Sequence, residues 1–286
     1  MHPQWARLRE ALDDPASDAT RLVSRADPVS ALFERGDCAI GLLPLDILDD
    51  LLAAYVRAAD AAALRRFAYV LIGQDFARHM VFTRLVDALA VNPAREAQLF
   101  AVRLWMDLGY EDDGPRALAL VRELCRDDPD GSAHVLLGYM THRGYGVAKD
   151  EAENARLQAV AAERGNADAM FELSVLAYNG ALGPRDSDAA IRWCRAAADH
   201  GHARAGYNLG AFYATGDGVP QDPARALEWY LKASAAGHGQ ASAMAGIMTW
   251  KGDGTSPDAA RGQQLLALAE SQGVDPTPLL EEAGLA

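Results

Sequence analysis

Cysteine, aromatic residues and long apolar runs are all scarce in this 286-residue sequence. The three cysteines, Cys38, Cys125 and Cys194, are too few and too scattered for a disulfide framework or a zinc site, so we interpret them as small buried side chains. The longest apolar runs, such as residues 67–72, are far too short to cross a bilayer. The first residues lack the apolar stretch of a secretory signal peptide, and we therefore expect a cytoplasmic protein.

Positive charge is also in deficit. The chain carries 27 Lys and Arg residues against 40 Asp and Glu residues, a formal net charge of −13. Binding to nucleic acid requires a basic face, so this balance argues against nucleic acid as a partner and favours a basic partner protein. Half of the residues are apolar and alanine is abundant, which is typical of helices that pack closely through small side chains.

The sequence repeats itself with a period of 36 residues. Glycine closes four successive units, and the same residue type returns at the fourth, fifteenth, twenty-first and thirty-second place of each. The closing glycines are Gly165, Gly201, Gly237 and Gly273; the others are Ala133, Ala169, Ala205 and Ala241, then Gly144, Gly180, Gly216 and Gly252, then Asp150, Asp186, Asp222 and Asp258, then Ala161, Ala197, Ala233 and Ala269. Such self-similarity indicates stacked supersecondary units.

Each repeated position has a mechanical role in a helical hairpin. Glycine adopts positive φ without strain, so the loop glycines are expected to end the first helix. Asp222 stands where an N-cap belongs, and Pro223 suits the first position of the second helix. Alanines are expected where helices cross, because larger side chains would hold the axes apart. We predict an all-α fold, a right-handed α-α superhelix (solenoid) of about six helical hairpins with N- and C-terminal caps.

The domain organisation follows from where the period is clear and where it weakens. Residues 130–273 are predicted to form four 36-residue repeats. Pro93 and Pro129 continue the period upstream, so residues 58–129 are predicted to form two degenerate tetratricopeptide-like hairpins, 58–93 and 94–129. Residues 1–57 are expected to be an N-terminal helical cap and residues 274–286 a C-terminal capping helix.

The repeat resembles a known family. Its most complete copy contains Ala205, Leu209, Gly210, Tyr213, Gly216, Asp222, Ala226, Trp229, Ala233 and Gly237. This spacing is similar to that of the Sel1-like repeat (SLR), a relative of the tetratricopeptide repeat, over about half of the chain. Leu182 departs from the pattern by replacing the second loop glycine, and Leu157 and Leu265 replace the aromatic residue of the second helix. The resemblance implies a protein-interaction scaffold with no catalytic residues and no cofactor, although fold alone does not fix function.

In solenoids of this type the first helix of each hairpin usually lines the concave face. Residues there that do not fit the packing positions are candidate partner-binding residues, and exposed aromatic residues beside a cation are typical of interface hot spots. They are Tyr139, His142, Arg143, Phe171, Tyr178, Asn179, Tyr207, Trp250 and Lys251. For Phe171 and Tyr178, packing against a neighbouring hairpin is an equally good interpretation.

Little in the sequence points to catalysis or metal binding. The pair Gly216 and Gly218 follows a predicted helix rather than a strand and lacks a P-loop lysine, so we interpret it as a hairpin turn. Cys194, His200 and His202 lie near one another in sequence, but no fourth metal ligand is evident. We therefore expect a protein that is not an enzyme and holds no metal.

These observations predict a cytoplasmic monomer that binds another protein, with no nucleic acid as partner and no insertion into a membrane. Two roles stay open. One is a bacterial adaptor in a signalling or secretion assembly. The other is an immunity protein that neutralises a cognate basic secreted toxin by direct binding.

Overall fold

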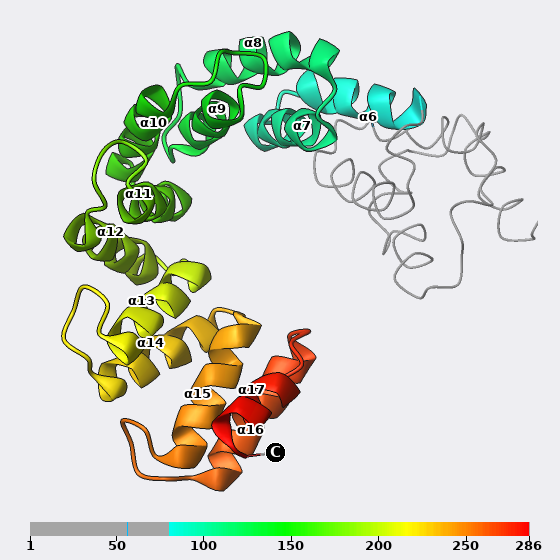
Figure 1. The fold of residues 1–286 in the computed structure, drawn as a ribbon. Helices are drawn as coiled ribbons and strands as arrows, with labels where there is room; N and C mark the ends of the chain where they lie inside the picture. Colours follow the sequence, from blue (N-terminus) through cyan, green and yellow to red (C-terminus); the bar gives the residue numbers. More distant parts are fainter. Residues whose placement is uncertain (1–55, 57–79, 286) are drawn as a thin grey trace, which may run out of the picture. The chain divides into compact units, whose positions relative to one another are not determined.

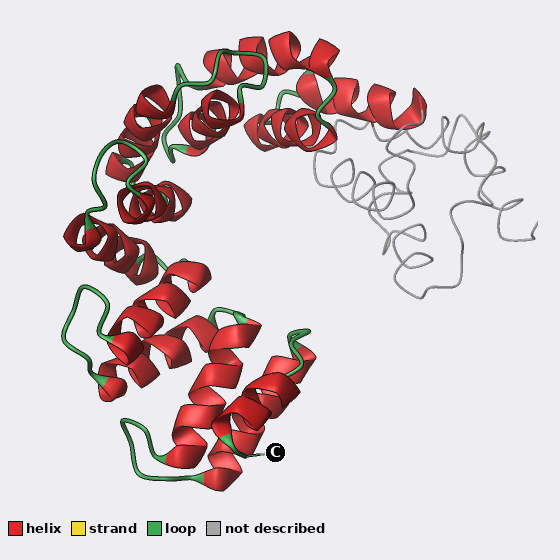
Figure 2. Cartoon of the chain, in the orientation of Figure 1, coloured by secondary structure: helices red, strands yellow, loops and turns green. Residues whose placement is uncertain are grey.

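The computed structural model describes residue 56 and residues 80–285, and the regular elements within them are all helical (Figure 2). The predicted N-terminal cap over residues 1–57 lies outside the described residues, except for Val56. The first part of the predicted hairpin 58–93 and Cys38 lie outside them as well. None of the described helices is long and apolar enough to span a bilayer.

The chain divides into two compact units, residues 1–127 with 144–148, and residues 128–143 with 149–286. In the described part of the first unit each helix packs against its neighbour in sequence. Its elements are α6 (Met80–Ala90), α7 (Arg95–Leu108), a short 3-10 helix η3 (Glu111–Asp113) and α8 (Gly114–Leu124).

The second unit is a series of hairpins in which each helix packs against the next, both within a hairpin and between hairpins (Figure 1). The hairpins are α9 (Ser132–Arg143) with α10 (Glu151–Glu163), α11 (Ala167–Asn179) with α12 (Ser187–Asp199), α13 (Ala203–Thr215) with α14 (Pro223–Ala235), and α15 (Gly239–Lys251) with α16 (Ala259–Ser271). A short helix, α17 (Thr277–Ala283), follows. The predicted all-α fold of stacked hairpins is confirmed.

The repeated aspartates cap the second helix of every hairpin, as the sequence predicts. The Asp222 carboxylate accepts a hydrogen bond from the Arg225 N–H at 3.0 Å. In the same way, Asp150, Asp186 and Asp258 each accept from the backbone N–H of the residue three positions later. The Asp222 backbone N–H also donates to the carbonyl oxygen of Tyr213, at 2.9 Å. The aspartate therefore starts the second helix and ties it to the last turn of the first.

Each boundary between repeats is closed by a shared set of hydrogen bonds. At the end of α14 the Gly237 N–H donates to the Ser234 carbonyl oxygen and the His238 N–H to that of Ala233, each at 3.0 Å, with Gly237 at a φ of 89°. This is the Schellman arrangement, which requires a left-handed residue. His238 is also the N-cap of α15, because its Nδ1 accepts from the Ala241 N–H at 3.2 Å. The residue that closes one repeat therefore opens the next.

Small residues allow the helices of a hairpin to approach closely. The alanines at the fourth place of the four repeats are all 0% exposed. Between α13 and α14 the contact is closer still, because the buried ring of Tyr230 lies against Gly210, where a Cβ would approach the ring to 2.7 Å. Tyr230 is the largest fully buried side chain in the described part of the chain.

We predict that Tyr230→Ala lowers the free energy of unfolding by about 3–5 kcal/mol, because it leaves a cavity against Gly210. Asp222→Ala should cost only about 1 kcal/mol, the usual effect of a lost N-cap. Urea denaturation followed by circular dichroism measures both. A larger loss for Asp222→Ala than for Tyr230→Ala would contradict this description of the core.

The second glycine of the hairpin loop docks the loop onto the preceding repeat. Gly218 has a φ of 74°, and a Cβ there would lie 2.8 Å from Cδ1 of Ile191 on α12. Gly254 approaches the start of α14 in the same way, where a Cβ would lie 2.4 Å from the Pro223 carbonyl oxygen. Leu182 stands at the equivalent place in the α11–α12 loop, and its side chain is 58% exposed.

Gly218 and Leu182 occupy the same place in two repeats, and we expect substitution by alanine to affect stability differently at each. Gly218→Ala combines a positive φ with a clash against Ile191, and we expect it to cost more than about 1 kcal/mol. Leu182→Ala removes an exposed side chain and should change the free energy of unfolding by less than about 0.5 kcal/mol. Equal effects of the two substitutions in urea melts would show that the loop contact does not contribute to stability.

Candidate functional site

Four places on α11 and on α13 form a row that lies outside the buried core. They are the third, seventh, tenth and fourteenth of the unit, and their spacing puts them on one face of the helix. On α11 they are Asp168, Glu172, Val175 and Asn179; on α13, Arg204, Asn208, Ala211 and Thr215. All eight are exposed or half-buried, and their types change between repeats while the alanine and aspartate positions do not. We call this surface of α11 and α13 the first-helix face. At the same places on α9 and α15, Leu136 and Ile247 are buried and belong to the core.

A depression of about 300 Å³ opens on the first-helix face between α11 and α13. Its lining residues are Ser174, Val175, Tyr178, Asn179, Asn208, Ala211 and Phe212. Two of these, Tyr178 and Asn179, are among the predicted partner-binding residues, and sequence reasoning missed the other five. Val175, Asn208 and Ala211 could have been found from the sequence, because the residue type at their places in the repeat differs from one repeat to the next.

Tyr178 forms a wall of this depression and is fixed by the next hairpin. Its hydroxyl donates to the Asp217 carboxylate at 3.0 Å, and its ring lies 5.7 Å from that of Phe212, centroid to centroid. The Arg185 guanidinium lies 4.0 Å from the Tyr178 ring centroid and pairs with both Asp217 oxygens. Hydrogen bonds from Arg185 and Tyr178 lower the pKa of Asp217. The aromatic side of the depression is thus held in place.

Phe171 and Tyr207 stack on histidines that begin the next repeat. The Phe171 ring lies 4.5 Å from that of His202, and the Tyr207 ring 4.8 Å from that of His238, both nearly parallel. Both aromatic residues are half-buried against the hydrophobic core. For these two rings, packing between repeats accounts for the contacts.

The other predicted residues lie at some distance along the chain, on α9 and α15. Tyr139 is half-buried against the core, and His142 pairs with Glu151 at 2.8 Å. Arg143 is exposed at the end of α9. On α15, Trp250 is half-buried and Lys251 exposed. The structure therefore brings Tyr178 and Asn179 together in one depression and leaves the remaining candidates outside it.

Glu172 lies one turn before Val175 on the first-helix face and is half-buried. Burial raises the pKa of its carboxyl group; His142 and Arg204 act in the opposite direction, and Glu151 adds to the rise. Within residues 80–285, no hydrogen bond or ion pair reaches its carboxylate. This acid was not predicted from the sequence, because no spacing rule distinguishes it.

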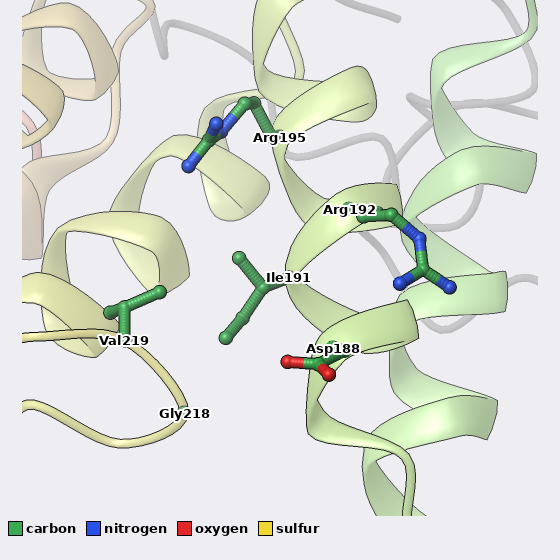
Figure 3. A pocket seen from close by; sticks show the side chains of 6 residues that line it. All are labelled: Asp188, Ile191, Arg192, Arg195, Gly218 and Val219. Atoms are coloured by element: carbon green, nitrogen blue, oxygen red, sulfur yellow. The ribbon is translucent and has the colours of Figure 1, made fainter.

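A second depression of about 300 Å³ lies on the second-helix side, between α12 and the loop of the next hairpin (Figure 3). Its lining residues are Asp188, Ile191, Arg192, Arg195, Gly218 and Val219. Ile191 and Val219 face each other across it, while Arg192 and Arg195 point apart (Figure 3). Arg195 donates to the Tyr213 hydroxyl. The depression follows the seam where the loop packs onto α12, so we interpret it as part of repeat packing.

The residues weighed as metal ligands have structural contacts. Cys194 is buried and donates to the Ala205 carbonyl oxygen at 3.2 Å, and burial raises its pKa to about 12. His200 contacts the Ala196 carbonyl oxygen at 2.9 Å, and His202 caps α13. In the described part of the chain, no group of three His, Cys, Asp or Glu side chains could hold a metal ion.

The histidine caps make stability depend on pH. His202 and His238 accept backbone N–H bonds through Nδ1, which a protonated ring cannot do, and burial lowers the pKa of both rings. Asp168, 3.4 Å from Nε2 of His202, opposes this shift, and Arg204 adds to it for both rings. The unfolded rings take up protons first as pH falls through about 6.5.

We predict that the free energy of unfolding decreases as the pH is lowered from about 7.5 to about 5.5. Replacing both histidines by asparagine should flatten this dependence, because Asn166 already caps α11 through its side-chain oxygen in the preceding repeat. Urea melts at several pH values compare the two proteins. Parallel pH profiles for the wild type and the double variant would show that these caps do not titrate in this range.

A family model, the Sel1 repeat, matches residues 131–156, 167–202, 203–238 and 239–274. These four matches fall on the four hairpins of the second unit. No relative was found among curated proteins.

The chain is similar to several solved structures of bacterial proteins. A Sel1 repeat protein from Oxalobacter formigenes is 26% identical with a TM-score of 0.54, covering 72% of this chain and 84% of its own. A protective antigen with an SLR fold from uropathogenic Escherichia coli is 18% identical with a TM-score of 0.54, covering 90% of this chain and 56% of its own. An immunity protein from Pseudomonas aeruginosa is 21% identical with a TM-score of 0.49, covering 76% of this chain and 82% of its own.

The predicted resemblance is thus confirmed at two levels, by the repeat model and by the shared hairpin fold. Residues 131–274 therefore carry four matches to the Sel1 repeat, one on each of the four hairpins from α9 to α16.

Proposed function

We propose that this chain binds a partner protein on its first-helix face and has no catalytic activity. Sel1 repeat proteins are protein-interaction scaffolds. The observation that carries the proposal is a contrast along α11 and α13. The buried alanine of these two helices recurs at one place, as Ala169 and Ala205, whereas the residues of the exposed or half-buried row differ. A surface that stability does not constrain is available for recognition.

The depression between α11 and α13 supports this proposal. It combines apolar surface from Val175, Ala211 and Phe212 with the carboxamides of Asn179 and Asn208. Ligand sites are typically apolar hollows with a few polar groups that fix orientation. In the described part of the chain neither carboxamide has a hydrogen-bond partner, so both are available to a bound chain.

The charge of the chain supports a basic partner. With a net charge of −13, the protein attracts cationic surfaces at long range, which raises association rates more than it raises affinity. A bacterial adaptor and a protein that neutralises a basic toxin both fit this description. They differ in what happens to the partner, since a neutralised toxin loses its activity in the complex and a partner held by an adaptor keeps it.

The test is affinity capture with the full chain, followed by mass spectrometry. Asn179→Ala combined with Asn208→Ala should weaken binding of the captured partner about tenfold or more, because two polar contacts are lost. Arg192→Ala, at an exposed position on α12, is the matched control and should bind like the wild type. The proposal fails if the double variant and the control retain the partner equally.

The identified partner then allows kinetics at two salt concentrations. The association rate should fall as salt rises and screening shortens to about 8 Å, while the asparagine substitutions should act mainly on dissociation. Measuring the activity of the partner in the complex separates neutralisation from an adaptor role.

A further inference from the structure

We infer that Glu172 and the depression beside it bind an extended peptide segment of the partner in which a Lys or Arg side chain precedes or follows an apolar side chain with one residue between them. The inference rests on the proposed function, because it concerns the same first-helix face. It adds the chemistry of the recognised segment.

Glu172 is the first element of this site. It is half-buried, and no hydrogen bond or ion pair reaches its carboxylate within residues 80–285. Partial burial without a donor disfavours the charged form of a carboxyl group, and it raises the pKa of Glu172. A basic side chain of a bound protein would supply a charge-assisted hydrogen bond.

The two basic residues that act on Glu172 electrostatically have contacts of their own. Arg204 acts on Glu172 electrostatically, but its guanidinium carbon lies 5.4 Å from the centroid of the Phe171 ring, in a cation–π contact. His142 is paired with Glu151 at 2.8 Å. Glu172 is therefore left for a cation that the chain does not provide.

The place of Glu172 carries a carboxylate in this repeat alone, and at the same place Leu136 is buried and Met244 packs against the core. The equivalent residues in the other three repeats are Leu136, Asn208 and Met244, an apolar residue, an amide and a thioether. A carboxylate at this place is particular to one repeat, the one whose next turns form the depression. A structural requirement would return with the period, as the N-cap aspartates do.

The depression is the second element and selects an apolar side chain. Val175, Ala211 and Phe212 give it apolar surface, and Asn179 and Asn208 border it with donors and acceptors suited to a peptide backbone. Its residues on α11 lie four to five positions beyond Glu172 on average, about 7 Å along the helix axis. Side chains two residues apart in an extended peptide are separated by about the same distance.

The probes are capped nine-residue peptides on an array, each with a central Lys-x-Leu or Leu-x-Lys motif, where x is serine. Matched peptides replace lysine by glutamate, replace leucine by serine, or remove the spacing residue. We expect the full-length protein to retain the basic and apolar motif at least about tenfold better than each matched peptide. Equal retention of the lysine and glutamate peptides, or no retention of any peptide, would overturn the inference.

Charge substitutions in the full chain then locate the contact, with fluorescence anisotropy of the labelled Lys-x-Leu peptide as the readout. Glu172→Gln should weaken binding about tenfold or more, because it keeps the shape and removes the charge. Arg204→Gln should strengthen it, because it removes a positive charge that repels the lysine of the peptide. Glu163→Gln, the same change at an exposed position on α10, controls for net charge and should have little effect.

The outcomes separate this inference from the proposed function. Equal effects of Glu172→Gln and Glu163→Gln would reject the contact with Glu172. If the captured partner still depends on Asn179 and Asn208, binding on the first-helix face would stand without it. Urea melts of Glu172→Gln should show no loss of stability, since the carboxylate has no partner to lose, and a strongly destabilised variant would instead indicate a structural role.

Discussion

The repeat array depends on one constraint, which is that the residue closing a repeat also begins the next. At Gly237 and His238 a left-handed glycine turns the chain, and the following residue is bonded both backward to α14 and forward to α15. No linker separates the repeats, so their spacing cannot vary without breaking a cap. This fixed spacing appears in the sequence as the 36-residue period. It also brings the helices close together, which is why buried alanines recur.

The same constraint divides the residues of each repeat between two tasks. Positions within a few residues of a helix end are determined by backbone geometry and recur, as Asp222 and Gly237 show. Positions on the first-helix face contribute little to that geometry and differ between repeats. Glu172 and Asn208 stand at one place in successive units, where one has a carboxylate and the other an amide; of the two, Asn208 lines the depression. Specificity can thus change while the scaffold stays unchanged.

The fold was predictable because its determinants are local. An aspartate that caps three residues ahead and a glycine at positive φ act over distances that the sequence displays directly. The site was only partly predictable, since its contacts join different hairpins. Tyr178 is held by Asp217, 39 residues away, and Phe171 by His202, and no local pattern relates such pairs. The 36-residue period does indicate that an aromatic residue on a first helix lies next to the following repeat. It does not indicate which side chain of that repeat the aromatic ring contacts.

Leu182 makes the array uneven. In a solenoid each repeat contacts only its neighbours. The cooperativity of unfolding therefore depends on every interface between repeats, and the weakest interface limits it. Where Gly218 and Gly254 dock their loops onto the preceding repeat, the α11–α12 hairpin carries an exposed leucine instead. The interface between this hairpin and the one before it lacks that brace, and sub-global opening would begin there rather than at a random boundary. The α11–α12 hairpin that bounds this interface also carries Glu172, so the least braced boundary of the array lies beside the surface to which we assign binding.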